Sequence, residues 1–246
     1  VFISMASVLV DSGLGAALIQ KKKITVNETS TVFFSNLIIA VVLYILVFFT
    51  APFISQFYNQ SILTNALRVI GLIMILDSFY LVPNSLLIRL LKFKHTAIIN
   101  IISLMVSGII GIYCAYEGFG LWSLIFQQLT LSLTKAILFF TLGTWRPLFI
   151  FSLSSYKDLY KFSSKLLLAS IFQNLYLNLY YLIIGKLFSV NSLGYYTQAK
   201  RLNDIPVSTL VSLFNQVTFP IFSGFQDDNV KLKDLYKKNI KFTFFI

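Results

Sequence analysis

The sequence predicts an all-α protein whose helices cross a membrane several times. Of its 246 residues, 57% are hydrophobic and 12% are charged, which is about half the charged share of a soluble domain. So few charged side chains argue against a soluble globular enzyme. The high hydrophobic share argues against a disordered chain, which would need low hydrophobicity. The single cysteine, Cys114, excludes a disulfide scaffold and a cysteine-based zinc site.

Seven apolar stretches are long enough to cross the roughly 30 Å hydrocarbon core of a bilayer as helices. The strands of a membrane β-barrel would instead alternate in polarity over about 10 residues. The predicted spans are residues 1–20, 32–53, 66–88, 96–116, 121–143, 166–185 and 205–226. Residues 239–246 begin an eighth apolar stretch, and we therefore expect a fragment of a larger protein.

The loops between the predicted spans alternate in their content of Lys and Arg. One set, with 14 such residues, comprises residues 21–30, 89–95, 144–163 and 224–241. The other set, with 2, comprises residues 58–65, 117–120 and 188–204. The positive-inside rule places the first set in the cytoplasm. The net charge of +11 then needs no nucleic-acid partner, because the charges form no single patch, and membrane lipids are the expected neighbours.

Several segments are familiar in their order and spacing. They are DSGLGAALIQKKK, STVFFSNLI, APFISQFYN, GFGLWSLIFQQL, WRP, IIGKLFSVNSLGYYTQAKRL and VTFPIFSGFQDD. In these segments the chain resembles bacterial oligosaccharide flippases for O-antigen and exopolysaccharide, which belong to the multidrug/oligosaccharidyl-lipid/polysaccharide exporter superfamily. The resemblance extends over essentially the whole chain.

The resemblance implies two pseudo-symmetric helix bundles around a central cavity that opens alternately to each side of the bacterial cytoplasmic membrane. The expected substrate is an undecaprenyl-pyrophosphate-linked oligosaccharide, and polysaccharide assembly proteins are candidate partners. Aligned on the family, residues 1–143 form most of the first bundle from the second span onward, 144–163 a cytoplasmic linker, and 164–246 the start of the second bundle. A cation-coupled multidrug antiporter of the same superfamily and a membrane polysaccharide polymerase are the alternatives.

Polar side chains inside the spans are candidates for contacts with such a substrate. Arg68 and Lys135 interrupt predicted spans, and a cation at the bilayer centre costs about 2.5–3.5 kcal/mol on insertion scales. Snorkelling to the headgroups is the alternative for both. In the helix expected over 164–187, Asn174, Asn178 and Tyr181 share one face. They suit hydrogen bonding to sugar hydroxyls, or they join helices inside the membrane.

Three further cations depart from the alternation of charge, since Lys186, Lys200 and Arg201 fall on the side that carries few basic residues. We expect them to contact a pyrophosphate, with ordinary interfacial charges as the alternative. Asp11 and Asp77 are acids within predicted spans, and either one suits the binding of a coupling proton or cation. For Asp11 the alternative is a role in the packing of its glycine-rich segment.

The chain offers little support for catalysis. It lacks paired carboxylates, a Ser-His-Asp set, a phosphate-cradling glycine loop and a cluster of metal ligands in its sequence. Its single histidine, His95, lies in a basic loop. The sequence therefore predicts a transporter rather than an enzyme, without a cofactor or a bound metal.

Overall fold

The computed structural model of the chain describes residues 2–11, 13–143, 145–188, 190–224 and 229–244. Within these ranges the regular secondary structure is entirely α-helical, as predicted. The helices are α1 (Phe2–Asp11), α2 (Leu14–Gln20), α3 (Val26–Tyr58), α4 (Ile62–Ile70), α5 (Leu72–Arg89), α6 (Phe93–Tyr116), α7 (Leu121–Leu142), α8 (Leu153–Leu187), α9 (Val190–Gly224) and α10 (Asn229–Phe244).

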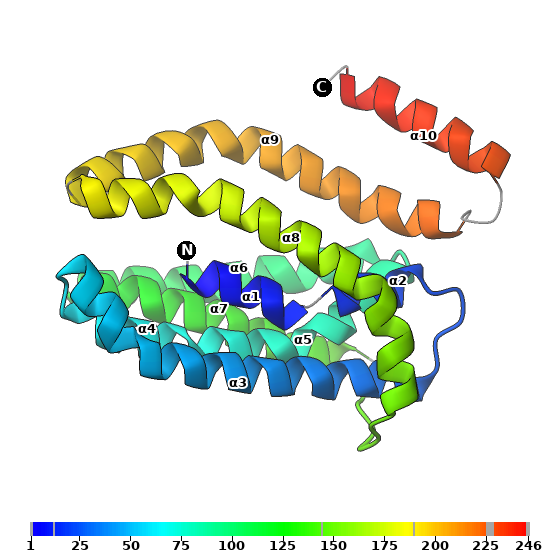
Figure 1. The fold of residues 1–246 in the computed structure, drawn as a ribbon, viewed down its shortest axis with the longest axis horizontal. Helices are drawn as coiled ribbons and strands as arrows, with labels where there is room; N and C mark the ends of the chain where they lie inside the picture. Colours follow the sequence, from blue (N-terminus) through cyan, green and yellow to red (C-terminus); the bar gives the residue numbers. More distant parts are fainter. Residues whose placement is uncertain (1, 12, 144, 189, 225–228, 245–246) are drawn as a thin grey trace.

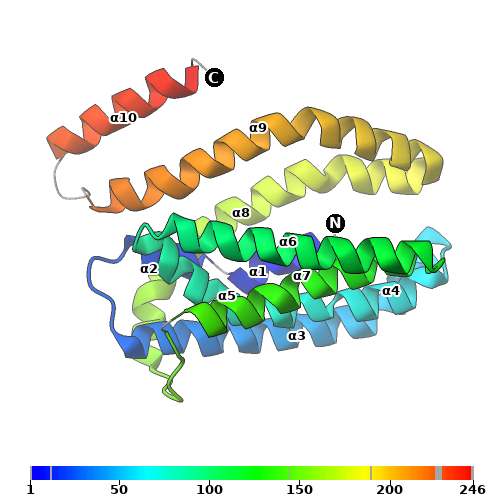
Figure 2. The ribbon, with the colours of Figure 1, turned by 180° about the vertical axis from the view of Figure 1, so that it is seen from behind.

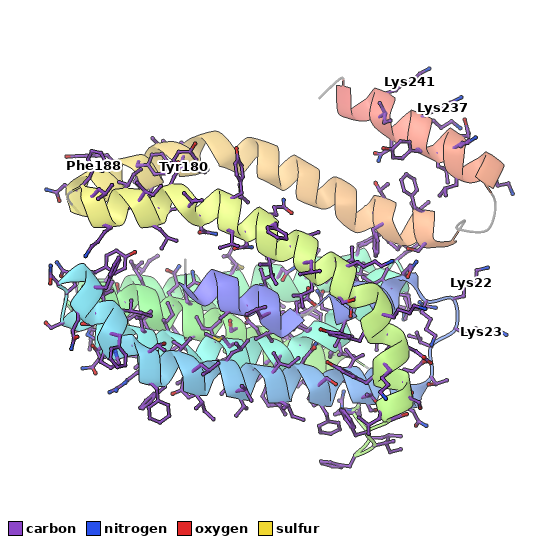
Figure 3. All side chains as sticks on the ribbon, in the orientation of Figure 1. Lys22, Lys23, Tyr180, Phe188, Lys237 and Lys241 are labelled. Atoms are coloured by element: carbon purple, nitrogen blue, oxygen red, sulfur yellow. The ribbon has the colours of Figure 1, made fainter. Side chains whose placement is uncertain are left out.

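The helices form two groups (Figures 1 and 2). Helices α1–α7 lie together as the first helix group, while α8 and α9 run side by side along one flank of it, with α10 beyond α9. We call α8–α10 the second helix group. One end of the molecule carries Lys22, Lys23, Lys237 and Lys241 (Figure 3), and we call it the lysine-rich end. Phe188 lies at the opposite end. The basic loops therefore gather at one end, as their alternation along the chain predicts.

Five segments are long and apolar enough to cross a membrane within the described ranges: Val26–Tyr58, Ile62–Arg89, Phe93–Tyr116, Leu121–Leu142 and Ser163–Ile184. They coincide with the second to sixth predicted spans, and the chain is therefore a multi-pass membrane protein. Residues 205–224 of the span predicted over 205–226 form the C-terminal part of the longer helix α9. Residues 225 and 226 and the side chains of residues 203–216 lie outside the description.

The predicted span 1–20 is divided into two short helices, α1 and α2. Gly13, at the start of α2, has a φ of 68°, a conformation that glycine adopts without steric cost. A Cβ atom on Gly13 would lie 2.8 Å from the carbonyl oxygen of Ser163 in α8. The break therefore lets the backbone of the first group approach α8 closely, which a side chain at this position would prevent.

Helix α3 begins at a capping box near the lysine-rich end. The Thr25 hydroxyl accepts the Glu28 N–H at 3.3 Å, and the Glu28 carboxylate accepts the Thr25 N–H at 2.9 Å. Lys21 adds an ion pair to Glu28 at 2.5 Å. With 33 residues, α3 is about 50 Å long. It therefore extends beyond the hydrocarbon core at one end or both.

Three consecutive hydroxyl side chains near the start of α3 hold the segment that joins the two groups. Thr29 accepts the indole N–H of Trp145, Ser30 accepts the backbone N–H of Leu148, and Thr31 accepts the backbone N–H of Ser152, each at 3.0 Å. The predicted linker is therefore docked on the first group, and α8 already begins inside it, at Leu153.

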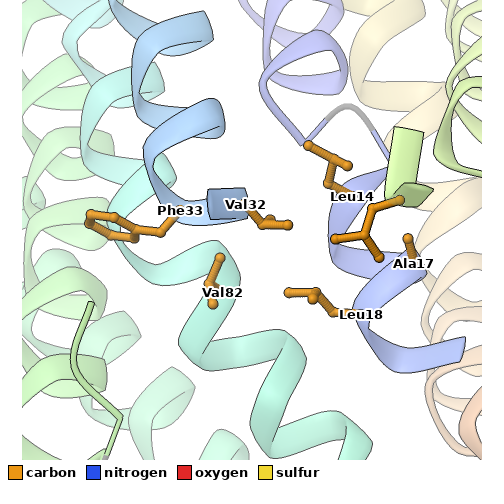
Figure 4. Close-up of a cluster of buried hydrophobic side chains, with 7 residues drawn as sticks. Leu14, Ala17, Leu18, Val32, Phe33 and Val82 are labelled. Carbon is orange, nitrogen blue, oxygen red and sulfur yellow. The ribbon is translucent and has the colours of Figure 1, made fainter. Parts of the chain in front are cut away.

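A buried apolar cluster near the lysine-rich end joins helices of both groups (Figure 4). Its members are Leu14, Ala17, Leu18, Val32, Phe33, Val82 and Leu159. These side chains come from α2, α3, α5 and the first turns of α8. Because lipid tails are as apolar as these side chains, close packing stabilises such contacts inside a membrane more than exclusion of water does. The start of α8 is therefore fixed to the first group by packing as well as by hydrogen bonds.

Candidate functional site

A polar cluster lies between α5 and α7, and we call it the α5–α7 cluster. It consists of Asp77 and Tyr80 on α5 and Ser132 and Lys135 on α7. The Lys135 ammonium lies 5.6 Å from the centroid of the Tyr80 ring, and the Ser132 and Tyr80 hydroxyls lie beside the Asp77 carboxylate. The structure thus brings together two predicted site residues, Lys135 and Asp77, that are 58 positions apart.

The surroundings of Lys135 place its charge inside the first group. The Tyr80 ring beneath the ammonium stacks on Phe139 with centroids 5.6 Å apart, and Phe139 is fully buried. In the described part of the chain, no carboxylate lies within 4 Å of the Lys135 ammonium. A cation on an aromatic face without a direct ion partner is well placed to accept an anionic ligand.

One oxygen of Asp77 is also available for a further interaction. Its Oδ1 atom is buried and has no hydrogen-bond partner among the described residues, although Lys135 acts on the carboxylate electrostatically. A buried polar atom left in this state destabilises the fold, and in native proteins such atoms often belong to functional sites. A proton or a small cation at this oxygen would remove that cost.

Asp11 lies at the break between α1 and α2. Its carboxylate accepts the backbone N–H of Gly15 in the first turn of α2, where a negative charge is favourable. A Cβ atom on Gly15 would lie 3.0 Å from Asp11 Oδ1 and 2.8 Å from the Ser85 hydroxyl. These contacts fit a role for Asp11 in the packing of the glycine-rich segment, and its role in ion coupling stays a prediction.

A second polar cluster, the α8–α9 cluster, lies between the first two helices of the second group. The rings of Tyr181 on α8 and Tyr196 on α9 meet edge to face with centroids 5.5 Å apart. The Lys200 ammonium lies 5.9 Å from the Tyr181 ring centroid. Asn178 donates its amide to the backbone and side-chain oxygens of Asn174, at 2.8 and 2.9 Å. Two aromatic faces, a cation and amide groups together suit a sugar or phosphate ligand.

Two aromatic residues of these clusters were not among the predicted site residues. Tyr80 lies three positions after Asp77, and Tyr196 lies four positions before Lys200. Residues three or four apart share a face of a helix. A search for aromatic side chains at this spacing from each predicted charged site residue would have found both.

The remaining predicted site residues, all of them cations, are not placed in the α5–α7 or the α8–α9 cluster. The Arg68 guanidinium donates to the Phe48 carbonyl at 3.3 Å and lies 4.3 Å from the Phe48 ring centroid. The Lys186 ammonium donates to the Phe57 carbonyl at 2.6 Å. Both cations therefore contact the C-terminal half of α3. The side chain of Arg201 lies outside the described residues.

A polar cavity of about 290 Å³ lies at the lysine-rich end between the two groups. It is lined by Ile19, Gln20, Lys21, Lys22, Arg89, Pro220, Ser223 and Gly224. Arg89 donates to the carbonyls of Leu18 and Ile19 at 2.7 and 3.1 Å, and also to the carbonyls of Lys21 and Lys22. A cation at this place satisfies carbonyls at the C-terminal end of α2.

The part of the chain that the structure describes contains no group of three or more His, Cys, Asp or Glu residues that could hold a metal ion. The polar clusters instead combine single charges with aromatic rings and hydroxyl or amide groups. Such an arrangement suits the binding of a polar ligand through electrostatics and hydrogen bonds.

Comparisons with known proteins identify relatives over most of the chain. A family model described as "Polysaccharide biosynthesis protein" matches residues 1–246. The teichuronic acid biosynthesis protein TuaB of Bacillus subtilis is 27% identical over 93% of this chain and 48% of its own length. The succinoglycan biosynthesis transport protein ExoT of Rhizobium meliloti is 26% identical over 88% of this chain and 44% of its own length.

The lipopolysaccharide biosynthesis protein WzxC of Escherichia coli is 27% identical over 96% of this chain and 49% of its own length. The chain thus spans about half the length of these curated relatives. No solved structure matches it significantly.

Proposed function

Because the chain belongs to the polysaccharide biosynthesis protein family, we propose that it forms part of a transporter for a lipid-linked oligosaccharide. The transporter moves the pyrophosphate-linked sugar of an undecaprenyl lipid from the cytoplasmic to the outer leaflet of the bacterial cytoplasmic membrane. The lysine-rich end faces the cytoplasm. One relative supports a role in transport, since it is named a succinoglycan biosynthesis transport protein. Another, named a lipopolysaccharide biosynthesis protein, supports a role in the production of a surface polysaccharide.

The observation that carries this proposal is the position of Lys135. Its ammonium lies inside the first helix group against the Tyr80 ring, with no carboxylate of the described residues within 4 Å. A pyrophosphate that crosses the hydrocarbon core needs such a cation, because an unpaired ionised group is costly to bury. Lys135 therefore binds the pyrophosphate during its passage.

The α8–α9 cluster supplies a contact for the sugar in this proposal. The rings of Tyr181 and Tyr196 offer apolar faces against which a sugar ring can stack, and the amides of Asn174 and Asn178 offer hydrogen bonds to hydroxyl groups. The two clusters line a central cavity between two bundles, and the cavity opens alternately to each side. Lys200, Arg201, Arg68 and Lys186 are further anion contacts along this path.

Asp77 supplies the coupling in this proposal. Its buried Oδ1 lacks a hydrogen-bond partner among the described residues and binds a proton or a small cation. Asp11 is the second acid in this role.

The buried carboxylate of Asp77 favours one other function, a cation-coupled multidrug antiporter, because a buried carboxylate also suits a cationic drug. A membrane polysaccharide polymerase is a weaker candidate, since the turns at 59–61 and 117–120 are too short for an external catalytic loop.

Complementation tests the proposal in cells. The full-length protein is expressed in a strain that lacks its own lipid-linked oligosaccharide flippase, and surface polysaccharide is measured. We expect export to return with the natural protein and to fail with Lys135→Met at equal membrane abundance. The variant Lys94→Met is the matched control, since Lys94 is an exposed lysine of the lysine-rich end. Full export by Lys135→Met would refute the assigned role of Lys135.

A further inference from the structure

Lys186 forms a polar contact between the two helix groups at the opposite end of the molecule. Its ammonium, at the end of α8, donates to the backbone carbonyl of Phe57 in the last turn of α3 at 2.6 Å. The same ammonium lies 3.9 Å from the centroid of the Phe57 ring. Residues that are 129 positions apart are thus joined by a charge-assisted hydrogen bond and a cation–π contact.

The local structure of α3 explains why this carbonyl accepts a donor from another helix. The last carbonyls of a helix have no partner within it and carry partial negative charge. At the end of α3, the Ser55 and Gln56 carbonyls accept the backbone N–H groups of Gln60 and Asn59, at 3.1 Å each. The Phe57 carbonyl instead receives the ammonium of Lys186, which comes from the other helix group.

This contact is readily reversible. The side chains of both Lys186 and Phe57 are exposed, so water can replace the ammonium at the carbonyl when the two helices separate. A surface contact of this kind contributes little to stability and is weakened by salt. It can hold two helix groups together and still release them during a transport cycle.

At its other end, α8 is held much more firmly. The backbone of Gly13 lies so close to α8 that a Cβ atom there would be 2.8 Å from the Ser163 carbonyl oxygen and 3.3 Å from Leu166 Cβ. The linker before α8 is bound to Thr29, Ser30 and Thr31 by hydrogen bonds. One end of α8 is therefore packed and anchored, while the far end is held by an exposed lysine.

We propose that Lys186 is a latch that keeps the opposite end of the molecule closed, and that α8 pivots at its contact with Gly13 when the latch opens. This inference rests on the proposed transport function and adds a conformational role for Lys186. Release of the Phe57 carbonyl lets the ends of α3 and α8 move apart, whereas the Gly13–Ser163 contact stays in place. The opposite end then opens without loss of the packing at the lysine-rich end.

Distances between two spin labels test the latch directly. Cys114→Ser removes the one cysteine of the chain, and Gln60→Cys and Asn191→Cys then place labels at exposed positions beyond α3 and at the start of α9. Double electron–electron resonance is measured on the full-length protein in lipid nanodiscs. With Lys186 present we expect mainly the short distance. With Lys186→Met the ratio of long to short distances should rise about three- to tenfold, as for a charge-assisted hydrogen bond partly replaced by water.

Three further variants make the result specific. Lys186→Arg keeps a cationic donor and should retain the short distance, and Lys94→Met removes a lysine at the other end and should change nothing. Phe57→Ala removes the ring but keeps the carbonyl, and it should give a smaller shift than Lys186→Met. It also tests the contact independently if Lys186→Met folds poorly.

The latch is refuted if Lys186→Met has the same distance distribution as the parent protein, or if Lys186→Arg is as open as Lys186→Met. Because the experiment measures distances and not transport, its outcome is separate from that of the proposed function. A closed end that opens without Lys186 supports the latch even if the protein moves another substrate.

Discussion

The ammonium of Lys135 on α7 lies over the ring of Tyr80 on α5, 5.6 Å from its centroid. The contact fixes a positive charge inside the first helix group, close enough to the carboxylate of Asp77 to act on it electrostatically but without a direct ion pair. A lysine that only snorkelled would extend along its own helix toward the headgroups. Here the side chain reaches a neighbouring helix instead. The proposed binding of the pyrophosphate by Lys135 depends on this contact.

Tyr80 should stabilise the first group mainly through its ring. Tyr80→Ala removes the stack on Phe139 and leaves a space, so we expect a loss of stability on the order of 2 kcal/mol for this half-buried aromatic residue. Tyr80→Phe keeps the stack and loses one hydroxyl, which should cost about 1 kcal/mol or less. Thermal unfolding of both variants in the same detergent checks that Tyr80→Ala is the less stable of the two. Equal melting temperatures for the two variants would contradict it.

Gly13 should tolerate no side chain. Gly13→Ala combines a φ of 68° with a Cβ atom 2.8 Å from the Ser163 oxygen, so we expect a loss of more than about 1 kcal/mol. Gly108→Ala is the matched control, because a Cβ atom at this helical position meets nothing within 4 Å. There the exchange should be neutral or stabilising by about 0.5–1 kcal/mol. Thermal unfolding measures both, and a stable Gly13→Ala would rule out the close approach of α8.

The docking of the linker predicts protected amides. Thr31→Val keeps the shape of the side chain and removes the acceptor of the Ser152 N–H, which lies 3.0 Å away. Loss of one such bond should speed hydrogen exchange at Ser152 about three- to tenfold. Mass spectrometry of deuterium uptake over 145–152 measures this change. Thr50→Val is the control, since the Thr50 hydroxyl bonds within its own helix, and a similar effect of both variants would refute docking.

Asp77 should connect transport to an ion gradient. Asp77→Asn removes the charge and keeps the size of the side chain, so transport by this variant should no longer respond to an imposed proton or sodium gradient. Asp158→Asn, at an exposed acid near the start of α8, should respond as the natural protein does. Uptake of lipid-linked sugar is measured for both variants with and without the proton gradient and the sodium gradient. A full response by Asp77→Asn would exclude this carboxylate from coupling.

Composition and charge determine most of the fold in this chain. The run without charges between Glu28 and Arg68 predicts a span, and the alternation of basic loops predicts which ends of the helices lie together. Both are confirmed (Figure 3). The first depends on the cost of burying charges in hydrocarbon, and the second on the bias of Lys and Arg toward one side of the membrane, so both can be read from single stretches of sequence. The spacing of Asn174 and Asn178 likewise predicts their shared face, and the two side chains are hydrogen-bonded.

The contacts between distant segments could not be predicted in the same way. Nothing in the sequence around Thr29 indicates that its hydroxyl binds Trp145, 116 positions away. The partner of Lys186 is a backbone carbonyl, a group that every residue carries, so the sequence does not indicate that Phe57 supplies it. The break at Gly13 depends on how closely α8 approaches. These features arise from tertiary packing. The pattern of charges indicated Lys186 as a candidate, but it did not indicate what Lys186 binds.

Translocation in proteoliposomes tests the central claim most directly. The full-length protein is reconstituted with a fluorescent undecaprenyl-pyrophosphate oligosaccharide, and a membrane-impermeant quencher reports how much of it reaches the other leaflet over time. We predict transfer by the natural protein, at least a tenfold slower transfer by Lys135→Met, which removes a charge partner worth about 1.5–3 kcal/mol, and normal transfer by Lys94→Met. Movement of cationic fluorescent drugs without movement of the lipid-linked sugar would contradict the account.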